Sequence, residues 1–467
     1  MAEHTFDSLI RGGTVVGPNG PYKADIAVRD GTIVEIGTDL VATGEVIQAT
    51  GCLVLPGAID VHTHFDTEVD GRRTADTFES GSRAAVAGGV TTIVNFAIQR
   101  RGSSLWETVE QEIAKASSAC HIDYGLHVGV TDATETFLEE IPALADSGFT
   151  SFKMFMALGE SALSDRESIA FLSAVARAGC LALVHAEDGA LIDHRTAELL
   201  RQGKVSVRYL NTARPTMAEA LATERIAAYA GAVGCPLYVV HLSCKAALDA
   251  VRRARSDGIE VYVETRPAYL FLERWVYDRD DGAKFVTWPP IRGAEDQTAL
   301  WDGLAMGEIQ CYATDHTTWM LAEKMEPSCT FADVPGGVSN VQTSVPMLYN
   351  EAVRKGRISL MDFVALTSTN PAKLFGLWPN KGAIQVGADA DLYLVADGRR
   401  FVIRAEQMES RSDFDPYEGY VGDSWPILTM ARGDVLMRDG KVSSSAGRGR
   451  LVRRKRFRTL RNGRSAR

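Results

Sequence analysis

Residues 57–66 read GAIDVHTHFD, and this stretch decides the fold prediction. A short apolar run leads to two histidines, His62 and His64, at its end. Seven later runs repeat the form, each separated from the next by a longer amphipathic, Ala-rich stretch. They are TTIVNFAI (91–98), YGLHVGV (124–130), FTSFKMFMA (149–157), LALVHAED (181–188), LYVVHLS (237–243), IEVYVET (259–265) and IQCYATDH (309–316).

Eight strand–helix repeats predict an α/β fold with a parallel sheet. Eight units are the number that closes a TIM-like (β/α)8 barrel, which we place at residues 56–375. An open, doubly wound sheet is the structural alternative. No G-x-G-x-x-G follows a strand, so a dinucleotide-binding form of that sheet has little support.

The two flanks of the barrel share a different texture. Residues 1–55 and 376–445 contain short apolar runs separated by turn signals such as Asp-Gly and Pro-Asn-Gly. Neither flank shows a long helical pattern. We therefore expect one small β-sandwich domain built from both ends of the chain.

The composition is that of an ordinary globular chain, with 45% hydrophobic and 24% charged residues among 467. We find no secretory signal and no apolar run near the 18 residues of a membrane span, which predicts a soluble, cytoplasmic protein without a membrane partner. The seven cysteines show no C-x-x-C pairing. Free thiols are therefore expected rather than a disulfide framework or a cysteine zinc site.

The last segment, residues 446–467, is a basic tail. From Gly440 to Arg467 there are 11 Lys and Arg and no acid, while the whole chain carries −10. Such a tail can bind nucleic acid, can be solvated, or can lie on an acidic neighbouring subunit. Nothing else in the chain suggests nucleic acid, so we expect one of the latter two.

Six titratable side chains fall late in five of the predicted strands. In a TIM barrel that end is the C-terminal face, where active sites lie. His62 and His64 are two residues apart, so both side chains leave a strand on the same face. A packed or solvent-facing histidine is the ordinary alternative for each, and the prediction rests on the set. The set is His62, His64, Lys153, His185, His241 and Asp315.

Imidazole and carboxylate suit zinc, and manganese or cobalt accept similar ligands. Six ligands are too many for one tetrahedral ion and fit two divalent ions. Lys153 is either an ordinary buried lysine or a reactive one. In the second case nearby charge depresses its pKa, and the free amine reacts with CO2 to give a carbamate that bridges both ions.

At these residues the chain resembles the dihydropyrimidinase/hydantoinase (cyclic amidohydrolase) family of the amidohydrolase superfamily, nearly end to end. GAIDVHTHFD, FKMFMA, VHAED, YVVHLSC and ATDH resemble the family's metal-ligand strands. LTSTNPAKLFGLWPNKGAIQVGADADLYL resembles its return into the sandwich. The resemblance implies a small-molecule cyclic amide substrate and a homotetramer or homodimer.

The resemblance also implies a role for each residue. His62 and His64 would bind the more buried metal, and His185 and His241 the second. Lys153, as its carbamate, would bridge the two ions. Asp315 would bind the first metal and act as general acid and base, while hydroxide held by both ions attacks the amide carbonyl.

Three positions depart from the family pattern. Leu158 stands where the family has an oxyanion-binding Tyr, Trp288 where it has Ser, and Gly336 where it often has Asn. Trp288, Trp319, Phe155 and Leu158 could form a wall for an apolar ring substituent; they could equally be core, with Trp288 packing outward.

We therefore expect hydrolysis of a cyclic amide C–N bond, hydantoinase-like. The alternative within this chemistry is an allantoinase or a hydrolase of another imide or lactam. Asp66 replaces the Arg typical of dihydroorotases, which disfavours that substrate. From other classes, a non-catalytic scaffold and a mononuclear deaminase stay open, although a scaffold needs no ligand set and a deaminase has no use for a carboxylated lysine.

Overall fold

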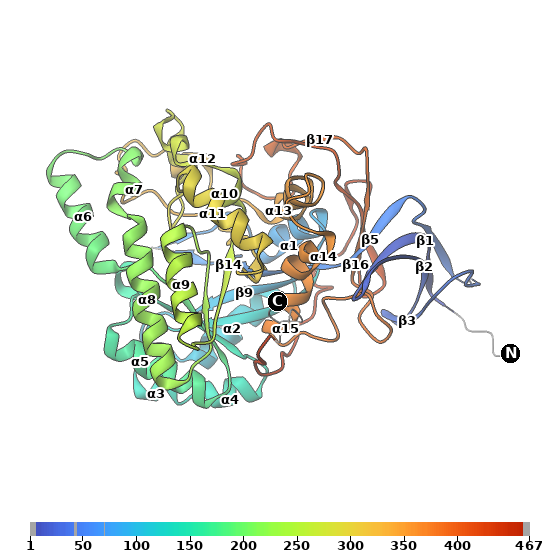
Figure 1. The fold of residues 1–467 in the computed structure, drawn as a ribbon, viewed down its shortest axis with the longest axis horizontal. Helices are drawn as coiled ribbons and strands as arrows, with labels where there is room; N and C mark the ends of the chain where they lie inside the picture. The colour runs from blue at the N-terminus through green and yellow to red at the C-terminus, as the bar shows by residue number, and fades with distance from the viewer. Residues whose placement is uncertain (1–5, 42–43, 70, 461–467) are drawn as a thin grey trace.

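The computed structural model describes residues 6–41, 44–69 and 71–460. Parallel strands form a barrel ringed by helices, and a separate β-domain lies at one side (Figure 1). The barrel strands are β6 (Ala58–Thr63), β9 (Val90–Ile98), β10 (Asp123–Gly129), β11 (Ser151–Phe155), β12 (Leu181–His185), β13 (Leu237–Val239), β14 (Val261–Thr265) and β15 (Cys311–Tyr312).

The barrel closes on itself. Its strands pair in the order β15-β14-β13-β12-β11-β10-β9-β6, every pair parallel. A further parallel bridge joins Thr63 to His316, and the His64 amide donates to the His316 carbonyl at 2.9 Å. The predicted TIM-like barrel is confirmed, and the open sheet is wrong.

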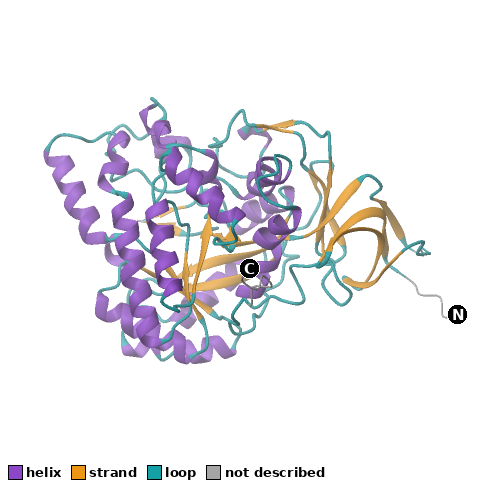
Figure 2. Ribbon diagram, in the orientation of Figure 1, coloured by secondary structure: helices purple, strands orange, loops and turns teal. Residues whose placement is uncertain are grey.

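Helices surround the strands (Figure 2). Their starts follow from local sequence: α5 begins after Ser164, whose hydroxyl and the Glu167 carboxylate cap each other's backbone amides. The helices are α1 (Phe78–Ala87), α2 (Leu105–Ser117), α3 (Glu135–Leu138), α4 (Ile141–Asp146), α5 (Asp165–Arg177), α6 (Gly189–Arg201), α7 (Leu210–Ala213), α8 (Thr216–Val233), α9 (Lys245–Ser256), α10 (Pro267–Phe271), α11 (Ala294–Ala305), α12 (Leu321–Lys324), α13 (Val341–Leu348), α14 (Leu360–Val364) and α15 (Asn370–Leu374).

Strands from both ends of the chain form the second domain, as predicted. Its nine-stranded mixed sheet runs β21-β20-β19-β16-β5-β1-β2-β3, with β4 beside β1, and it encloses its own apolar cluster. The strands are β1 (Ser8–Gly17), β2 (Gly20–Arg29), β3 (Thr32–Gly37), β4 (Glu45–Gln48), β5 (Cys52–Pro56), β16 (Leu392–Ala396), β19 (Pro426–Ala431), β20 (Asp434–Arg438) and β21 (Lys441–Val442). Two short hairpins, β7–β8 (Glu68–Val69, Arg72–Arg73) and β17–β18 (Phe401–Val402, Val421–Gly422), lie outside both sheets.

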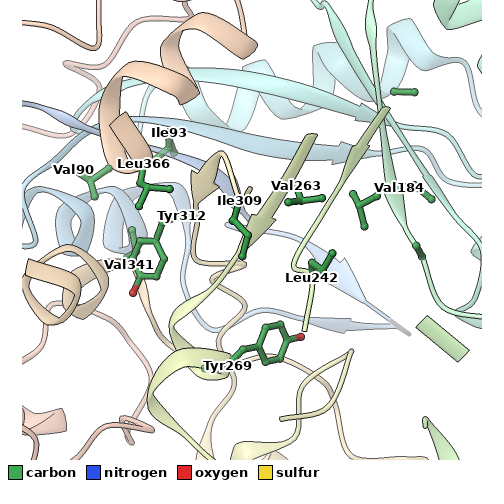
Figure 3. Packing of buried hydrophobic residues seen from close by; sticks show 14 of the residues in the cluster. Val90, Ile93, Val184, Leu242, Val263, Tyr269, Ile309, Tyr312, Val341 and Leu366 are labelled. Carbon is green, nitrogen blue, oxygen red and sulfur yellow. The ribbon is translucent and has the colours of Figure 1, made fainter. Parts of the chain in front are cut away.

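The main core fills the space between the barrel strands and their helices. Figure 3 shows part of it, with Val184 and Val263 of the barrel strands in the same buried cluster as Ile309, Tyr312 and Leu366. All of them are buried, so the strand ends project from a closely packed support. Among the described residues, no helix combines the length and apolar character needed to cross a bilayer.

The described part of the basic tail packs on its own barrel, which differs from the expectation of a solvated tail. The Tyr124 amide donates to the Arg450 carbonyl at 3.0 Å, and the Val452 amide donates back to Tyr124 at 2.8 Å. Arg454 is only 4% exposed and donates to the Leu126 carbonyl. Up to Leu460 the segment is thus not a free, solvated tail, and a role between subunits stays a prediction; residues 461–467 lie outside the described residues.

Candidate metal centre

The six predicted side chains converge at the carboxyl end of the barrel. His62 lies one residue before the end of β6, Lys153 in the middle of β11, and His185 at the last position of β12. His64, His241 and Asp315 follow β6, β13 and β15 by one to three residues. All six are buried, as a polar centre enclosed by the barrel mouth requires.

One group of these side chains meets around a carboxylate oxygen. Asp315 Oδ1 lies 3.1 Å from His62 Nε2 and 3.3 Å from His64 Nε2. Lys153 Nζ lies 3.3 Å from the same His62 nitrogen. Ligand atoms of the two histidines and the aspartate all fall within 4.8 Å of one another, so these three residues could hold a metal ion.

The second group is a pair of facing imidazoles. His185 Nδ1 lies 3.0 Å from His241 Nε2. The other ring nitrogen of His185 lies 2.9 Å from the Glu187 carboxylate, which also binds the Arg214 guanidinium. With its Nε2–H donated to Glu187, His185 presents the Nδ1 lone pair toward His241, as a metal ligand does.

A buried carboxylate orients the first group in the same way. Glu264 binds His62 Nδ1, so the Nε2 lone pair of His62 points at the centre. Glu264 also accepts hydrogen bonds from the Tyr238 hydroxyl at 2.9 Å and the His241 amide at 3.0 Å. This pattern of carboxylate-bound imidazoles fits metal ligation.

Burial sets the protonation of several groups. It lowers the pKa of His64 to about 4, and it also lowers the pKa values of His185 and His241. It lowers the pKa of the Lys153 ammonium to about 8, against the raising effect of the Asp315 and Glu264 carboxylates. Neutral imidazoles and a partly neutral amine are the forms that bind metal or react with CO2.

The second carboxylate oxygen of Asp315 binds an arginine side chain. The guanidinium of Arg266 binds Asp315 Oδ2 and also donates to the Tyr269 hydroxyl at 2.6 Å and the Pro289 carbonyl at 3.3 Å. Burial alone would raise the pKa of Asp315, but the charges of His62 and Arg266 outweigh it and hold that pKa well below its usual value. Asp315 is therefore an anchored carboxylate with Oδ1 facing the histidines.

Three residues that line the cavity adopt left-handed backbone conformations that side chains rarely take. The φ angles are 40° at His241, 50° at Asp315 and 78° at Leu158. Such strain persists where the surroundings impose it, and it concentrates at functional sites. Two of the three are predicted metal ligands and the third borders the cavity.

A cavity of about 140 Å³ opens above these groups. Phe155, Leu158, Trp288 and Gly336 line it, and contact of these four with a substrate stays a prediction. Trp319 is not among the described residues of that lining. It is fully buried behind the cavity, where its indole N–H donates to the Gly336 carbonyl at 2.8 Å.

The departures at Trp288 and Gly336 are one coupled feature. A Cβ placed on Gly336 would lie 2.8 Å from Cδ2 of the Trp288 indole and 3.1 Å from its Cγ. Contacts below 3.0 Å force one of the groups to shift, so the absence of a side chain at Gly336 is what lets the indole lie there.

Four supporting residues were not predicted. Glu187 and Glu264 orient imidazoles, Arg266 anchors Asp315, and Lys324 holds the cavity loops. The Lys324 ammonium is fully buried and donates to three carbonyls: Val286 at 2.8 Å, Pro335 at 2.6 Å and Gly337 at 2.9 Å. For Glu187, Glu264 and Arg266 the available signal was a charged residue at the end of an apolar run, as in VHAED and VYVETR.

A closed parallel barrel whose strand ends carry clustered histidines and a carboxylate defines a TIM-barrel protein with a candidate metal centre. Residues 53–436 match the amidohydrolase family. The D-hydantoinase of Ralstonia pickettii is 38% identical over 456 residues, spanning 97% of this chain and 100% of that protein. The chain therefore belongs to the amidohydrolase family and is a homologue of hydantoinases, and the predicted family is confirmed.

Solved structures give the same result. The dihydropyrimidinase of Brevibacillus agri NCHU1002 has a TM-score of 0.95 at 38% identity, covering 97% of this chain and 99% of that chain. The L-hydantoinase (dihydropyrimidinase) of Arthrobacter aurescens has a TM-score of 0.90 at 30% identity, covering 96% and 100%. Relatives named D-hydantoinase and L-hydantoinase thus share this fold.

Proposed function

We propose that this protein hydrolyses the C–N bond of a cyclic amide in a hydantoinase- or dihydropyrimidinase-like reaction. The observation that carries the proposal is the convergence of His62, His64 and Asp315 on one side and His185 and His241 on the other. Full-length similarity to hydantoinases supports the substrate class. A scaffold without chemistry has no need of this buried set.

The donor set fits two divalent ions, with zinc as the default and manganese or cobalt as alternatives. His62, His64 and Asp315 would hold one ion, His185 and His241 the other, and Lys153 both. For that role the neutral Lys153 amine adds to CO2, forms an N–C bond and releases a proton, which leaves an anionic carbamate. When bound, the ions would lower the pKa of a water molecule and polarise the amide carbonyl.

Asp315 is the residue that moves the proton. Its carboxylate accepts a proton from the attacking water and delivers it to the leaving ring nitrogen. Arg266 acts as a positioning residue, since its guanidinium fixes Oδ2 and thereby keeps Oδ1 at 3.1 Å from His62. Phe155, Leu158, Trp288 and Gly336 contact the substrate ring and its substituent.

Leu158 keeps a second candidate open within the same chemistry. A leucine cannot donate to an oxyanion, and the loss of one such donor typically costs about 10²–10³ in rate. A different substrate, such as allantoin, an imide or a lactam, would place its oxyanion differently, where another group would have to stabilise it. We also propose a homotetramer or homodimer, which light scattering would test.

The test is ring opening by protein loaded with zinc or manganese, with metal content measured in the same samples. The panel holds hydantoin, 5-aryl and 5-alkyl hydantoins in both hands, dihydrouracil, allantoin, succinimide and simple lactams. Opening of a hydantoin or dihydropyrimidine supports the first candidate, and selective opening of allantoin, an imide or a lactam supports the second. Two bound metals with no opening of any ring would refute the proposal.

A further inference from the structure

A second cavity adjoins the metal pocket on the side of α6 and α7. Its volume is about 520 Å³, compared with about 140 Å³ for the space above the histidines. The two spaces share Leu158, Ser161 and Trp288 in their linings, so they meet at these side chains. The larger one lies within the usual size range of small-molecule sites.

The buried walls of the second cavity are mainly apolar, while the exposed side chains of Glu160 and Asp193 also line it. Its lining includes Ile192 of α6, Leu210 and Ala213 of α7, and Phe331. The charged residue among its buried walls, Arg214, is already paired with Glu187. A group that enters this cavity therefore gains by removing apolar surface from water.

A polar groove also adjoins the metal pocket. A groove on the α2 side shares Glu68, Ile98 and Ser161 with it. Beyond these residues the groove is lined chiefly by polar and charged side chains, among them Arg101 and Gln111. An apolar group attached to the substrate ring gains less there, because it would displace water from charged groups.

Trp288 and Leu158 form the boundary between the metal pocket and the second cavity. The Arg214 guanidinium lies 5.3 Å from the centre of the Trp288 ring, and Gly336 packs directly against the same indole. Leu158 adopts a left-handed backbone, with φ 78°, at the same boundary. These side chains form the edge past which a substituent extends.

We propose that the substrate ring carries an extended apolar substituent, longer than a phenyl group, that passes Leu158 and Trp288 into the second cavity. This inference rests on the proposed function and names the substrate class of the same site. The ring lies over the histidines and the substituent lies between α6 and α7.

The test compares hydantoin, 5-phenylhydantoin and 5-(4-phenylbutyl)hydantoin. Turnover is measured with metal-loaded protein, and binding to the metal-free protein is measured by calorimetry. The cavity is formed by protein side chains alone, so binding does not require the metals. We expect the long compound to bind about tenfold tighter than hydantoin or better, with a matching gain in kcat/KM.

Two matched variants locate the substituent. Thr196→Trp fills the second cavity from α6, and Gln111→Trp fills the polar groove from α2; both replace an uncharged polar residue of a helix. Thr196→Trp should remove the advantage of the long compound and leave hydantoin within about twofold of the unmodified protein. Gln111→Trp should behave like the unmodified protein. Thermal melting confirms that both variants fold, and Ala332→Phe fills the second cavity from the loop side if Thr196→Trp does not.

The outcomes separate this inference from the proposed function. Equal handling of all three compounds by the unmodified protein, or loss of the long-chain advantage in Gln111→Trp, overturns the inference alone. Preferential binding of the long compound without opening of any ring supports the cavity assignment and contradicts the proposed function. If the long compound does not bind preferentially and no ring is opened, both the inference and the proposed function are contradicted.

Discussion

The floor and the wall of the cavity are built in different ways. The floor consists of side chains at strand ends, and polar partners orient its key ligands: Glu264 binds His62 and Glu187 binds His185. The wall consists of loop residues such as Leu158 and Trp288, which are held by packing. A rigid barrel thus fixes the groups that do chemistry, while the loops determine what reaches them.

Among changes to the floor of the cavity, Asp315→Asn should have the largest effect on turnover. The amide keeps the shape but cannot accept a proton, so we expect turnover to fall by about 10²–10⁴-fold. Activity assays on samples of known metal content measure this, with Asp302→Asn on the exposed face of α11 as the control. An Asp315→Asn protein that retains full turnover would show that another group moves the proton.

Glu264→Gln tests whether the floor depends on its supporting layer. Losing the carboxylate that orients His62 should weaken metal binding by about 10–100-fold, as measured by competition with a chelator. Glu260→Gln is the matched control. Glu260 lies just before the start of β14, away from the metal centre, and its carboxylate binds the Tyr262 hydroxyl. If both variants bind metal equally well, the orientation of His62 does not matter.

The floor could be predicted from sequence because strand geometry determines it. His62 and His64 share a face by the period of two, and parallel strands bring His185, His241 and Asp315 to one end. Glu264 and Arg266 escaped prediction because a charged residue in an apolar run does not reveal which partner it meets. The tail escaped for a related reason: basic composition does not show that Arg454 will be buried against the barrel.

Lys153 should make metal reloading depend on pH, which is a smaller effect than the two above. Burial lowers its pKa to about 8, so the neutral amine rises from roughly a tenth at pH 7 to roughly nine-tenths at pH 9. Carbamate forms only from the neutral amine and dissolved CO2, so at equal dissolved CO2 the reloading of metal-free protein should be about tenfold faster at the higher pH, and it should fail without bicarbonate. Reloading kinetics and the ¹³C signal of a labelled carbamate measure this, with Lys153→Arg as the control. Reloading that ignores bicarbonate and gives no ¹³C signal would contradict the carbamate.

The wall was less predictable, since its residues come from distant parts of the chain. Sequence comparison with the family identified Leu158, Trp288 and Gly336 as separate departures, and only the structure shows that two of them are in contact. The structure also shows that Trp319 lies behind the cavity. The sequence could not indicate this, because an aromatic residue near a strand end gives no sign of whether it faces substrate or core.

Gly336→Ala should give the smallest effect and the sharpest test of how the wall is built. Its Cβ would meet the Trp288 indole at 2.8 Å, so we expect a loss of about 1 kcal/mol in the free energy of unfolding, since the half-buried ring can shift. In a Trp288→Ser background the same change should cost almost nothing, because the indole is gone. Gly337→Ala is the control, since its φ of 119° and its contact with Thr317 make it costly in both backgrounds. Denaturant unfolding measures these costs. If Gly336→Ala costs the same with and without Trp288, the two residues are not coupled, and each loop residue sets the cavity shape independently.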